Sequence, residues 1–325
     1  MRRSLPAVRR VAFLLLLVAC GSRTGLFLDD EDPFTNIPGE DAGPDARRDS
    51  GRDARGVEDA PPGLDVRPPK DVDRSDCPDA DSTLVYTITS TYDLQSFNPD
   101  TGQFRLIGKI SCPAPASATP FSMAVDRRGI AYILFTDNRL YRVSTATAAC
   151  ISTPYVPGQS NFRLFGMGFA TNSIGPTETL YVAGDDRTDD QGVPGARGLA
   201  QITPGTFSLN PVGDFSPLIE QAELTGTGDG RLFAFYTKGN ASPPSYIGEI
   251  NPSTAAVVGE RRFDFVDQGQ GWAFAYWGGD FYMFHAPGGT TRVTRWRPSD
   301  DSITQVATTP LRIVGAGVST CAPQQ

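Results

Sequence analysis

A unit that recurs five times is the feature of this sequence that most restricts its fold. Each unit holds a short apolar stretch with an aromatic residue, and these aromatics are Tyr86, Tyr132, Tyr181, Phe233 and Tyr282. They lie 46, 49, 52 and 49 residues apart. Downstream of each, an apolar pair spaced i and i+3 precedes a polar turn, as in L-x-x-F-N-P-D-T-G at 94–102 and I-x-x-I-N-P-S-T at 247–254. A near-constant period of this length indicates one supersecondary unit repeated along the chain.

Each unit has the strand content of a propeller blade. A strand of small residues comes first, then a tight turn, the aromatic strand, the strand that leads into the polar turn, and a short last strand. β-Branched and aromatic residues fill the strands, while Asp-Gly and Asn-Pro pairs supply the turns. Four short antiparallel strands every 40–50 residues are typical of a β-propeller. We therefore predict an all-β fold, a five-bladed β-propeller over residues 83–325.

The two ends of this domain complete one blade. Residues 313–320 resemble an innermost strand with nothing after it, whereas residues 83–110 resemble a blade that lacks its innermost strand. Together they form the fifth blade and close the ring. Cys77 and Cys321 flank the gap that a hairpin fills in every other blade, so we expect them to form a disulfide. Cys112 and Cys150 are then left to pair with each other by elimination.

The pattern L-x-x-F-N-P-D-T-G-Q-F and its variants resemble the repeats of secreted bacterial propellers of the YVTN and quinoprotein-like kinds. The resemblance covers roughly residues 83–320 and lies in blade architecture. Those families include many members of unassigned activity, and the tryptophan docking repeats typical of quinone-cofactor enzymes are not visible here. The resemblance therefore implies a propeller and no cofactor.

The N-terminus reads as an export signal. Four arginines in the first ten residues precede an apolar run at 11–19, which is too short to cross a bilayer. The run ends in Leu17-Val18-Ala19-Cys20, which resembles the bacterial lipobox, and this implies cleavage after residue 19 and acylation of Cys20 by diacylglyceryl and palmitate-like chains. The alternative is an ordinary secretory cleavage site that happens to precede a cysteine. Gly21 after the cysteine, in place of Asp, favours the outer membrane over the inner membrane.

Residues 20–82 form a linker in this interpretation. Between Asp29 and Asp81 the chain has 17 acidic and seven basic residues, so the formal net charge of −8 belongs mainly to this stretch. Pro, Gly, Asp and Arg dominate, and such a composition buries too little apolar surface to offset chain entropy. We expect a disordered tether between the lipid anchor and the propeller, which places the domain in the cell envelope.

Polar residues gather where innermost strands begin, and hence at one mouth of the central channel. Acids, amides and an aromatic there could bind a ligand, and the candidates are Asn161, Arg163, Gln221, Glu223, Asp267, Gln270 and Trp272. The alternative is a polar rim around a channel that holds water. The acidic insert with Asp185, Asp186, Asp189 and Asp190 could take Ca²⁺, but a solvated loop is favoured and we expect no metal.

The function predicted from these features is that of a lipid-anchored binding or interaction module, a monomer for which binding is favoured over catalysis and enzymatic activity is left open. Its ligand would be a glycan, a peptide or another envelope protein, and its membrane contact would be made through Cys20. The alternative is a carboxylate-dependent envelope hydrolase of carbohydrate that uses Glu223 and Asp267. Basic patches are absent, which argues against nucleic acid. A single His285 excludes a multi-histidine zinc site.

Overall fold

The structure, a computed structural model, describes residues 63–65, 77, 84–172, 176–184, 195, 198–239 and 241–325. All of these lie in one compact unit, residues 57–325. The predicted signal peptide, Cys20 and the acidic insert 185–190 lie outside the described residues. Within the described part of the chain, no helix is long and apolar enough to cross a membrane.

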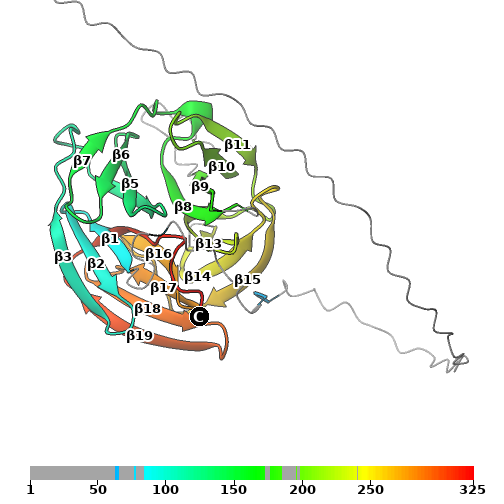
Figure 1. The fold of residues 1–325 in the computed structure, drawn as a ribbon. Coiled ribbons are helices and arrows are strands. Elements are labelled where there is room, and N and C mark those ends of the chain that lie inside the picture. Colours follow the sequence, from blue (N-terminus) through cyan, green and yellow to red (C-terminus); the bar gives the residue numbers. More distant parts are fainter. Residues whose placement is uncertain are drawn as a thin grey trace, which may run out of the picture. The chain divides into compact units, whose positions relative to one another are not determined.

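Five antiparallel sheets of four strands each surround a common centre (Figure 1). Blade 1 contains β20 (Ile313–Gly317), β1 (Val85–Thr89), β2 (Asp93–Asn98) and β3 (Gln103–Lys109). Blade 2 contains β4 (Pro120–Val125), β5 (Ile130–Phe135), β6 (Leu140–Ser144) and β7 (Cys150–Ser152). Blade 3 contains β8 (Phe165–Thr171), β9 (Glu178–Gly184), β10 (Gly198–Ile202) and β11 (Leu209–Gly213), preceded by the 3-10 turn η1 (Gln159–Asn161).

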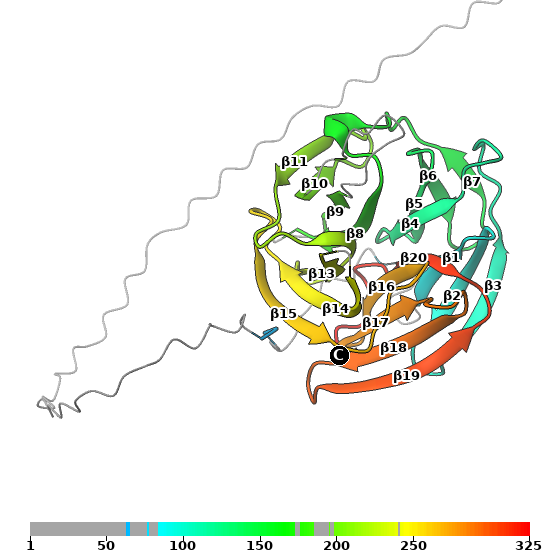
Figure 2. The same ribbon diagram turned by 180° about the vertical axis from the view of Figure 1, so that it is seen from behind.

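Blade 4 contains β12 (Glu220–Gly226), β13 (Leu232–Lys238), β14 (Ala241–Ile250) and β15 (Val257–Phe263). Blade 5 contains β16 (Trp272–Trp277), β17 (Asp280–His285), β18 (Thr291–Arg297) and β19 (Ser302–Thr309). Figure 2 shows the same ring from behind. The five-bladed propeller predicted from the repeats is therefore confirmed.

The hairpin between β16 and β17 illustrates how local sequence sets the register. The two strands pair from Trp272 opposite His285 to Trp277 opposite Asp280. Gly278 and Gly279 connect them with φ values of 59° and 82°. Positive φ at both central residues is what a type I′ turn requires, and glycine adopts it without steric strain. The turn therefore fixes which face of each strand packs inward.

Blade 1 is built from both ends of the domain, as predicted. β20 pairs with β1 so that Gly317 lies opposite Tyr86 and Ala316 opposite Thr87. Cys77 and Cys321 form a disulfide beside this junction, with Cα atoms 6.0 Å apart. The C-terminal strand thus closes the ring, and the bond stands where the other blades have a covalent hairpin.

The second predicted disulfide is also present. Cys112, after the last strand of blade 1, bonds to Cys150, the first residue of β7, and their Cα atoms are 5.0 Å apart. This bond joins the connection between blades 1 and 2 to the outermost strand of blade 2. The pairing reached by elimination is confirmed.

Innermost strands approach one another too closely for side chains at certain positions. A Cβ atom added to Gly166 of β8 would lie 2.0 Å from the carbonyl oxygen of Ala222 in β12. One added to Gly226 would lie 2.2 Å from the carbonyl oxygen of Phe169. Both obstacles are backbone atoms, so neither can swing away. Glycine at these two positions is therefore required for the close approach of blades 3 and 4.

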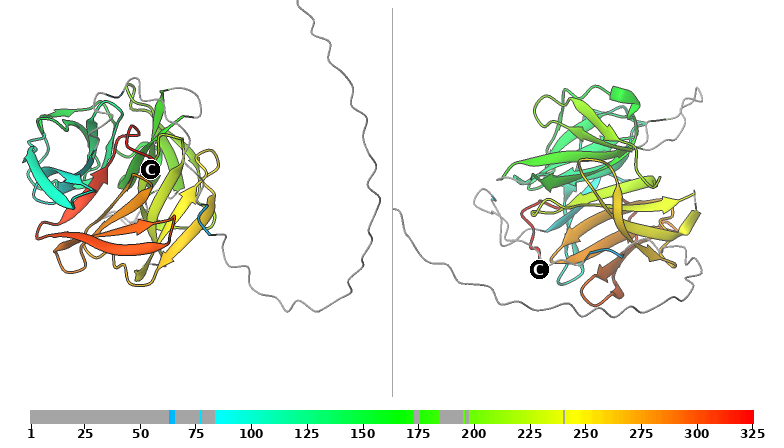
Figure 3. Two further views of the ribbon diagram at one scale, coloured as in Figure 1. Left: turned by 60° about the horizontal axis from the view of Figure 1, so that its bottom comes forward. Right: turned by 90° about the vertical axis from the view of Figure 1, so that its right-hand side faces the viewer.

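The apolar core lies in layers between adjacent blades. One cluster joins Ile88 and Leu94 of blade 1 to Met123 and Ile133 of blade 2, and four others follow the same scheme around the ring. The views in Figure 3 show the blades side by side around the ring. Since each blade packs against its two neighbours, opening the ring would expose apolar faces of the two blades at the break.

Candidate functional site

The innermost strands all begin on one face of the propeller, here called the mouth face, and end on the opposite face. A pocket of about 220 Å³ lies on the mouth face. Its lining comes from β4, β12, β16 and β20 and from the turns beside them, and comprises Ser90, Thr119, Pro120, Phe121, Thr136, Glu223, Gln270, Gly271, Trp272, Arg312 and Val314. We call this the mouth pocket. Pro120, Phe121, Trp272 and Val314 give it apolar and aromatic surface, and its other side chains are polar or charged.

The structure brings three of the seven predicted ligand-binding residues together in this pocket: Glu223, Gln270 and Trp272. The other four do not line it. Asn161 is exposed in η1, and Arg163 follows two residues later. Gln221 lies at a bulge of β12 with a φ of 44°. Asp267 lies before β16 and caps its own turn, its Oδ1 accepting from the N–H of Gly269 at 3.0 Å.

Glu223 forms the base of the mouth pocket. Ser122 of β4 donates its hydroxyl hydrogen to Glu223 Oε2 at 2.7 Å, and the carboxyl also hydrogen-bonds the main chain of Met167 in β8. The residue is 4% exposed. Burial raises the pKa of Glu223 well above its ordinary value, against the smaller lowering effects of these two hydrogen bonds. The side chain therefore links three innermost strands, and burial favours its uncharged form.

Trp272 stands on a rigid support. It pairs across the hairpin with His285, which is buried. The Nδ1 of His285 lies 3.0 Å from the carbonyl oxygen of Asp267, and its Nε2 lies 2.9 Å from the hydroxyl of Thr294. Because a carbonyl only accepts, Nδ1 carries the hydrogen and Nε2 accepts from Thr294. Burial lowers the pKa of His285, so the ring is a neutral structural element under the pocket.

Arg312 supplies the charge of the mouth pocket. It precedes β20, and its aliphatic stem lies over Gly271, where an added Cβ would come within 2.8 Å of Arg312 Cγ. Its Nη1 lies 3.5 Å from Gln270 Oε1, a long hydrogen bond and the one side-chain bond of Arg312 recorded among the described residues. Glu223 is the other titratable residue in the described lining, and burial favours its uncharged form. Arg312 is therefore the one basic residue of the described lining.

A buried hydrogen-bond network lies at the opposite end of the innermost strands. Arg127, in the turn after β4, is 4% exposed and donates to the hydroxyls of Thr171 and Thr320 at 3.5 and 3.3 Å. Its Nη2 lies 3.6 Å from the Sγ of Cys77. Glu178 accepts from the N–H of Arg127 and from Thr320. These contacts connect Arg127 to the ring-closing disulfide at the end opposite the mouth face.

This geometry does not support the hydrolase alternative. Glycosidases of the two-carboxylate type place an acid and a second carboxylate about 5–9.5 Å apart around the scissile bond. In the described lining of the mouth pocket, Glu223 is the single carboxyl, and it is committed to Ser122. Asp267 instead accepts a hydrogen bond from the main chain of its own turn. No group of three or more His, Cys, Asp or Glu side chains among the described residues is arranged to hold a metal ion.

Sequence reasoning missed Ser90, Phe121 and Arg312. They come from blades 1 and 2, whereas the predicted residues were sought before the innermost strands of blades 3, 4 and 5. Arg312 directly precedes β20 as Gly271 precedes β16. If the C-terminal strand is aligned with the innermost strands of the other repeats, Arg312 falls at the position of Gly271, and this alignment was the signal available for Arg312.

Comparison with known proteins gives distant structural similarities and no conclusion about activity. No protein-family model matches the chain, and no curated protein sequence matches it. Among solved structures, a chain of the nidogen/laminin complex is similar at 10% identity, with a TM-score of 0.45 over 75% of this chain and 100% of that one. The PQQ-bound aldose sugar dehydrogenase of Streptomyces coelicolor follows at 15% identity, with a TM-score of 0.40 over 69% and 78% of the two chains. TolB of Acinetobacter baumannii has 11% identity and a TM-score of 0.38 over 73% and 67%.

Proposed function

We propose that the protein is a lipid-anchored binding module of the cell envelope, whose mouth pocket holds a carboxylate-bearing sugar residue of a larger glycan. The observation that carries this proposal is the charge of the pocket. Arg312 is its one basic group among the described residues, while burial favours the uncharged form of Glu223. A carboxylate is thus attracted by Arg312.

The shape of the pocket favours a single sugar residue. Its volume of about 220 Å³ is below the roughly 300–1,000 Å³ of pockets that enclose a drug-sized ligand. Phe121 and Trp272 offer half-buried aromatic surfaces for stacking, and Ser90 and Gln270 offer polar groups at the rim. One residue at the end of a chain fits this arrangement better than a long segment.

The envelope location rests on the lipobox at Cys20 and on cysteine use. Two disulfides in the folded domain are typical of proteins that mature outside the reducing cytosol. The N-terminal segment meets the propeller on the face opposite the mouth, since Cys77 bonds there to Cys321.

Calorimetric titration tests the proposal with the mature chain from residue 20 carrying Cys20→Ser. The ligands are a glucuronic acid oligosaccharide, its neutral glucose counterpart and an acidic peptide. We expect the acidic sugar to bind and the neutral sugar to bind at least about tenfold more weakly. Arg312→Gln should lower the affinity for the acidic sugar by a similar factor, because it removes one charge-assisted hydrogen bond. Glu223→Gln, which keeps the group neutral, should retain binding.

Two results would overturn this function. Equal affinity for acidic and neutral sugars, or for wild type and Arg312→Gln, would remove the role of charge. Tighter binding of the acidic peptide than of the acidic sugar would show that the ligand is a peptide and not a glycan. Arg105→Gln is the matched control, because Arg105 lies exposed on the outer strand β3 and does not line the pocket.

A further inference from the structure

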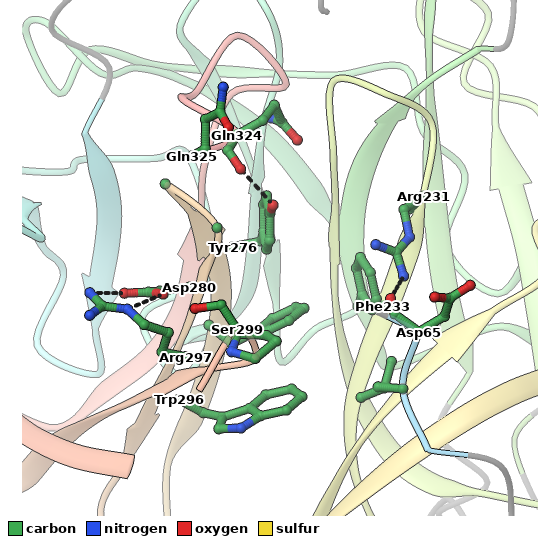
Figure 4. A pocket seen from close by; sticks show the side chains of 15 residues that line it. Asp65, Arg231, Phe233, Tyr276, Asp280, Trp296, Arg297, Ser299, Gln324 and Gln325 are labelled. Atoms are coloured by element: carbon green, nitrogen blue, oxygen red, sulfur yellow. Dashed lines mark hydrogen bonds and ion pairs between the residues drawn. The ribbon is translucent and has the colours of Figure 1, made fainter. Parts of the chain in front are cut away.

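A second pocket, independent of the mouth pocket, lies between blades 4 and 5 on the opposite face. Its volume is about 410 Å³. Blade 4 contributes Arg231 and Phe233, and blade 5 contributes an aromatic wall with Tyr276, Phe281 and Trp296. Figure 4 shows Arg231 and Phe233 on one side of an open space and Tyr276 and Trp296 on the other. We call this pocket the inter-blade groove.

The chain already places a short piece of its own N-terminal segment in the groove. Leu64 is half-buried and packs against the cluster that contains Phe233, Phe281 and Trp296. Arg231 Nη2 donates to the main-chain carbonyl of Asp65 at 2.8 Å. The groove therefore recognises one apolar side chain, that of Leu64, and one main-chain acceptor, the carbonyl of Asp65. Neither contact depends on an acidic side chain.

Arg231 is preorganised for this contact. Its Nε and Nη2 donate to the two carboxylate oxygens of Glu249 at 2.9 and 2.7 Å. Its guanidinium lies 4.8 Å from the ring centroid of Phe233. A bidentate partner and an aromatic face fix the plane of the guanidinium, so little side-chain entropy is lost when a carbonyl binds.

Space and an unused acceptor remain beside the docked segment. The groove keeps about 410 Å³ although Leu64 and Asp65 form part of its wall. Gln324 also lines it and is 6% exposed, and its Oε1 accepts no hydrogen bond from the described residues. An extended peptide carries both a carbonyl for Arg231 and an N–H for such an acceptor.

We propose that the inter-blade groove is a docking site for an extended peptide of a partner protein that presents a leucine-like side chain followed by a free main-chain carbonyl. Gly63–Leu64–Asp65 is the copy of this ligand that the chain carries itself, and it competes with the partner in cis. A tethered competitor acts at an effective concentration on the order of millimolar. The partner peptide must therefore displace the chain's own segment.

The test measures binding of a fluorescent peptide with the sequence of residues 60–68, APPGLDVRP, by anisotropy. The protein is the mature chain from residue 20 carrying Cys20→Ser. We expect Leu64→Ser to free the groove and to raise the affinity for the peptide about tenfold over the parent. Leu106→Ser is the matched control, because Leu106 is 59% exposed on the outer strand of blade 1.

Two further measurements, one with an altered peptide and one with an altered protein, show where the peptide binds. A peptide with serine in place of its leucine should not bind, and this arm leaves the protein unaltered. Arg231→Gln added to Leu64→Ser should weaken binding about tenfold, through loss of the hydrogen bond to the carbonyl. Equal affinity for the parent and Leu64→Ser, absence of binding to both, or equal binding of the two peptides would overturn the proposal.

Discussion

Removing the bond between Cys77 and Cys321 should open the ring at blade 1. The bond closes a loop of 244 residues, and the chain-entropy model gives about 5 kcal/mol for loops of this length. The bond between Cys112 and Cys150 closes a loop of 38 residues, for which the same model gives about 4 kcal/mol. Alanine is the appropriate replacement at Cys321, because the residue is 2% exposed and a serine would bury a hydroxyl.

The assay compares Cys77→Ala/Cys321→Ala with Cys112→Ala/Cys150→Ala in urea. We expect the first pair to lower the free energy of unfolding more than the second. Hydrogen exchange gives a local reading, because β20 is the strand that the first bond ties down. Its amides should lose protection in the first variant and keep it in the second.

The reasoning fails if the ring-closing bond contributes less than about 1 kcal/mol, or if β20 is as protected without it as with it. Either result would mean that pairing of β20 with β1 and packing between blades hold the ring alone.

Three further predictions follow from single residues. Gly166→Ala should destabilise by about 1–3 kcal/mol in thermal unfolding because its Cβ meets backbone, while Gly288→Ala, with open space around it, should change little. Burial raises the pKa of Glu178 to about 7 from 4.5, so the stability gained by its protonation is complete below pH 4.5 and is lost as the pH rises through 7. The loss of stability is at most about 3 kcal/mol. Glu178→Gln should flatten the dependence of the urea midpoint on pH between 4.5 and 8. An unchanged slope in this variant would refute the prediction. Radiolabelled palmitate should label the wild type and not Cys20→Ala, and equal labelling would exclude the lipobox.

The sequence was sufficient to predict the blades because each repeat carries its own strand and turn signals. Strand order, the completion of blade 1 by 313–320 and the partners of Cys77 and Cys321 all follow from the register of the repeat. Local patterns suffice for these features, since β-hairpins are set by their own turns.

The candidate sites were predicted only in part, because they depend on contacts between distant segments. Arg312 reaches the mouth pocket from the C-terminal strand, and the hydrogen bond of Ser122 to Glu223 joins residues 101 apart. The docking of Leu64 was not anticipated either, since an acidic, proline-rich composition predicts a tether. Leu64 is a large apolar residue within that stretch, and this was the signal available.

The three tryptophans of the chain allow the central claim to be tested directly. Trp272 lines the mouth pocket, Trp296 lines the inter-blade groove, and Trp277 lies at the far end of β16 from Trp272. Indole N–H resonances, assigned with single Trp→Phe variants, would be followed by NMR during titration with the glucuronic acid oligosaccharide. A binding module of the kind proposed gives a saturating shift of the Trp272 resonance while those of Trp277 and Trp296 stay in place. No shift at Trp272, or a shift confined to Trp296, would contradict it.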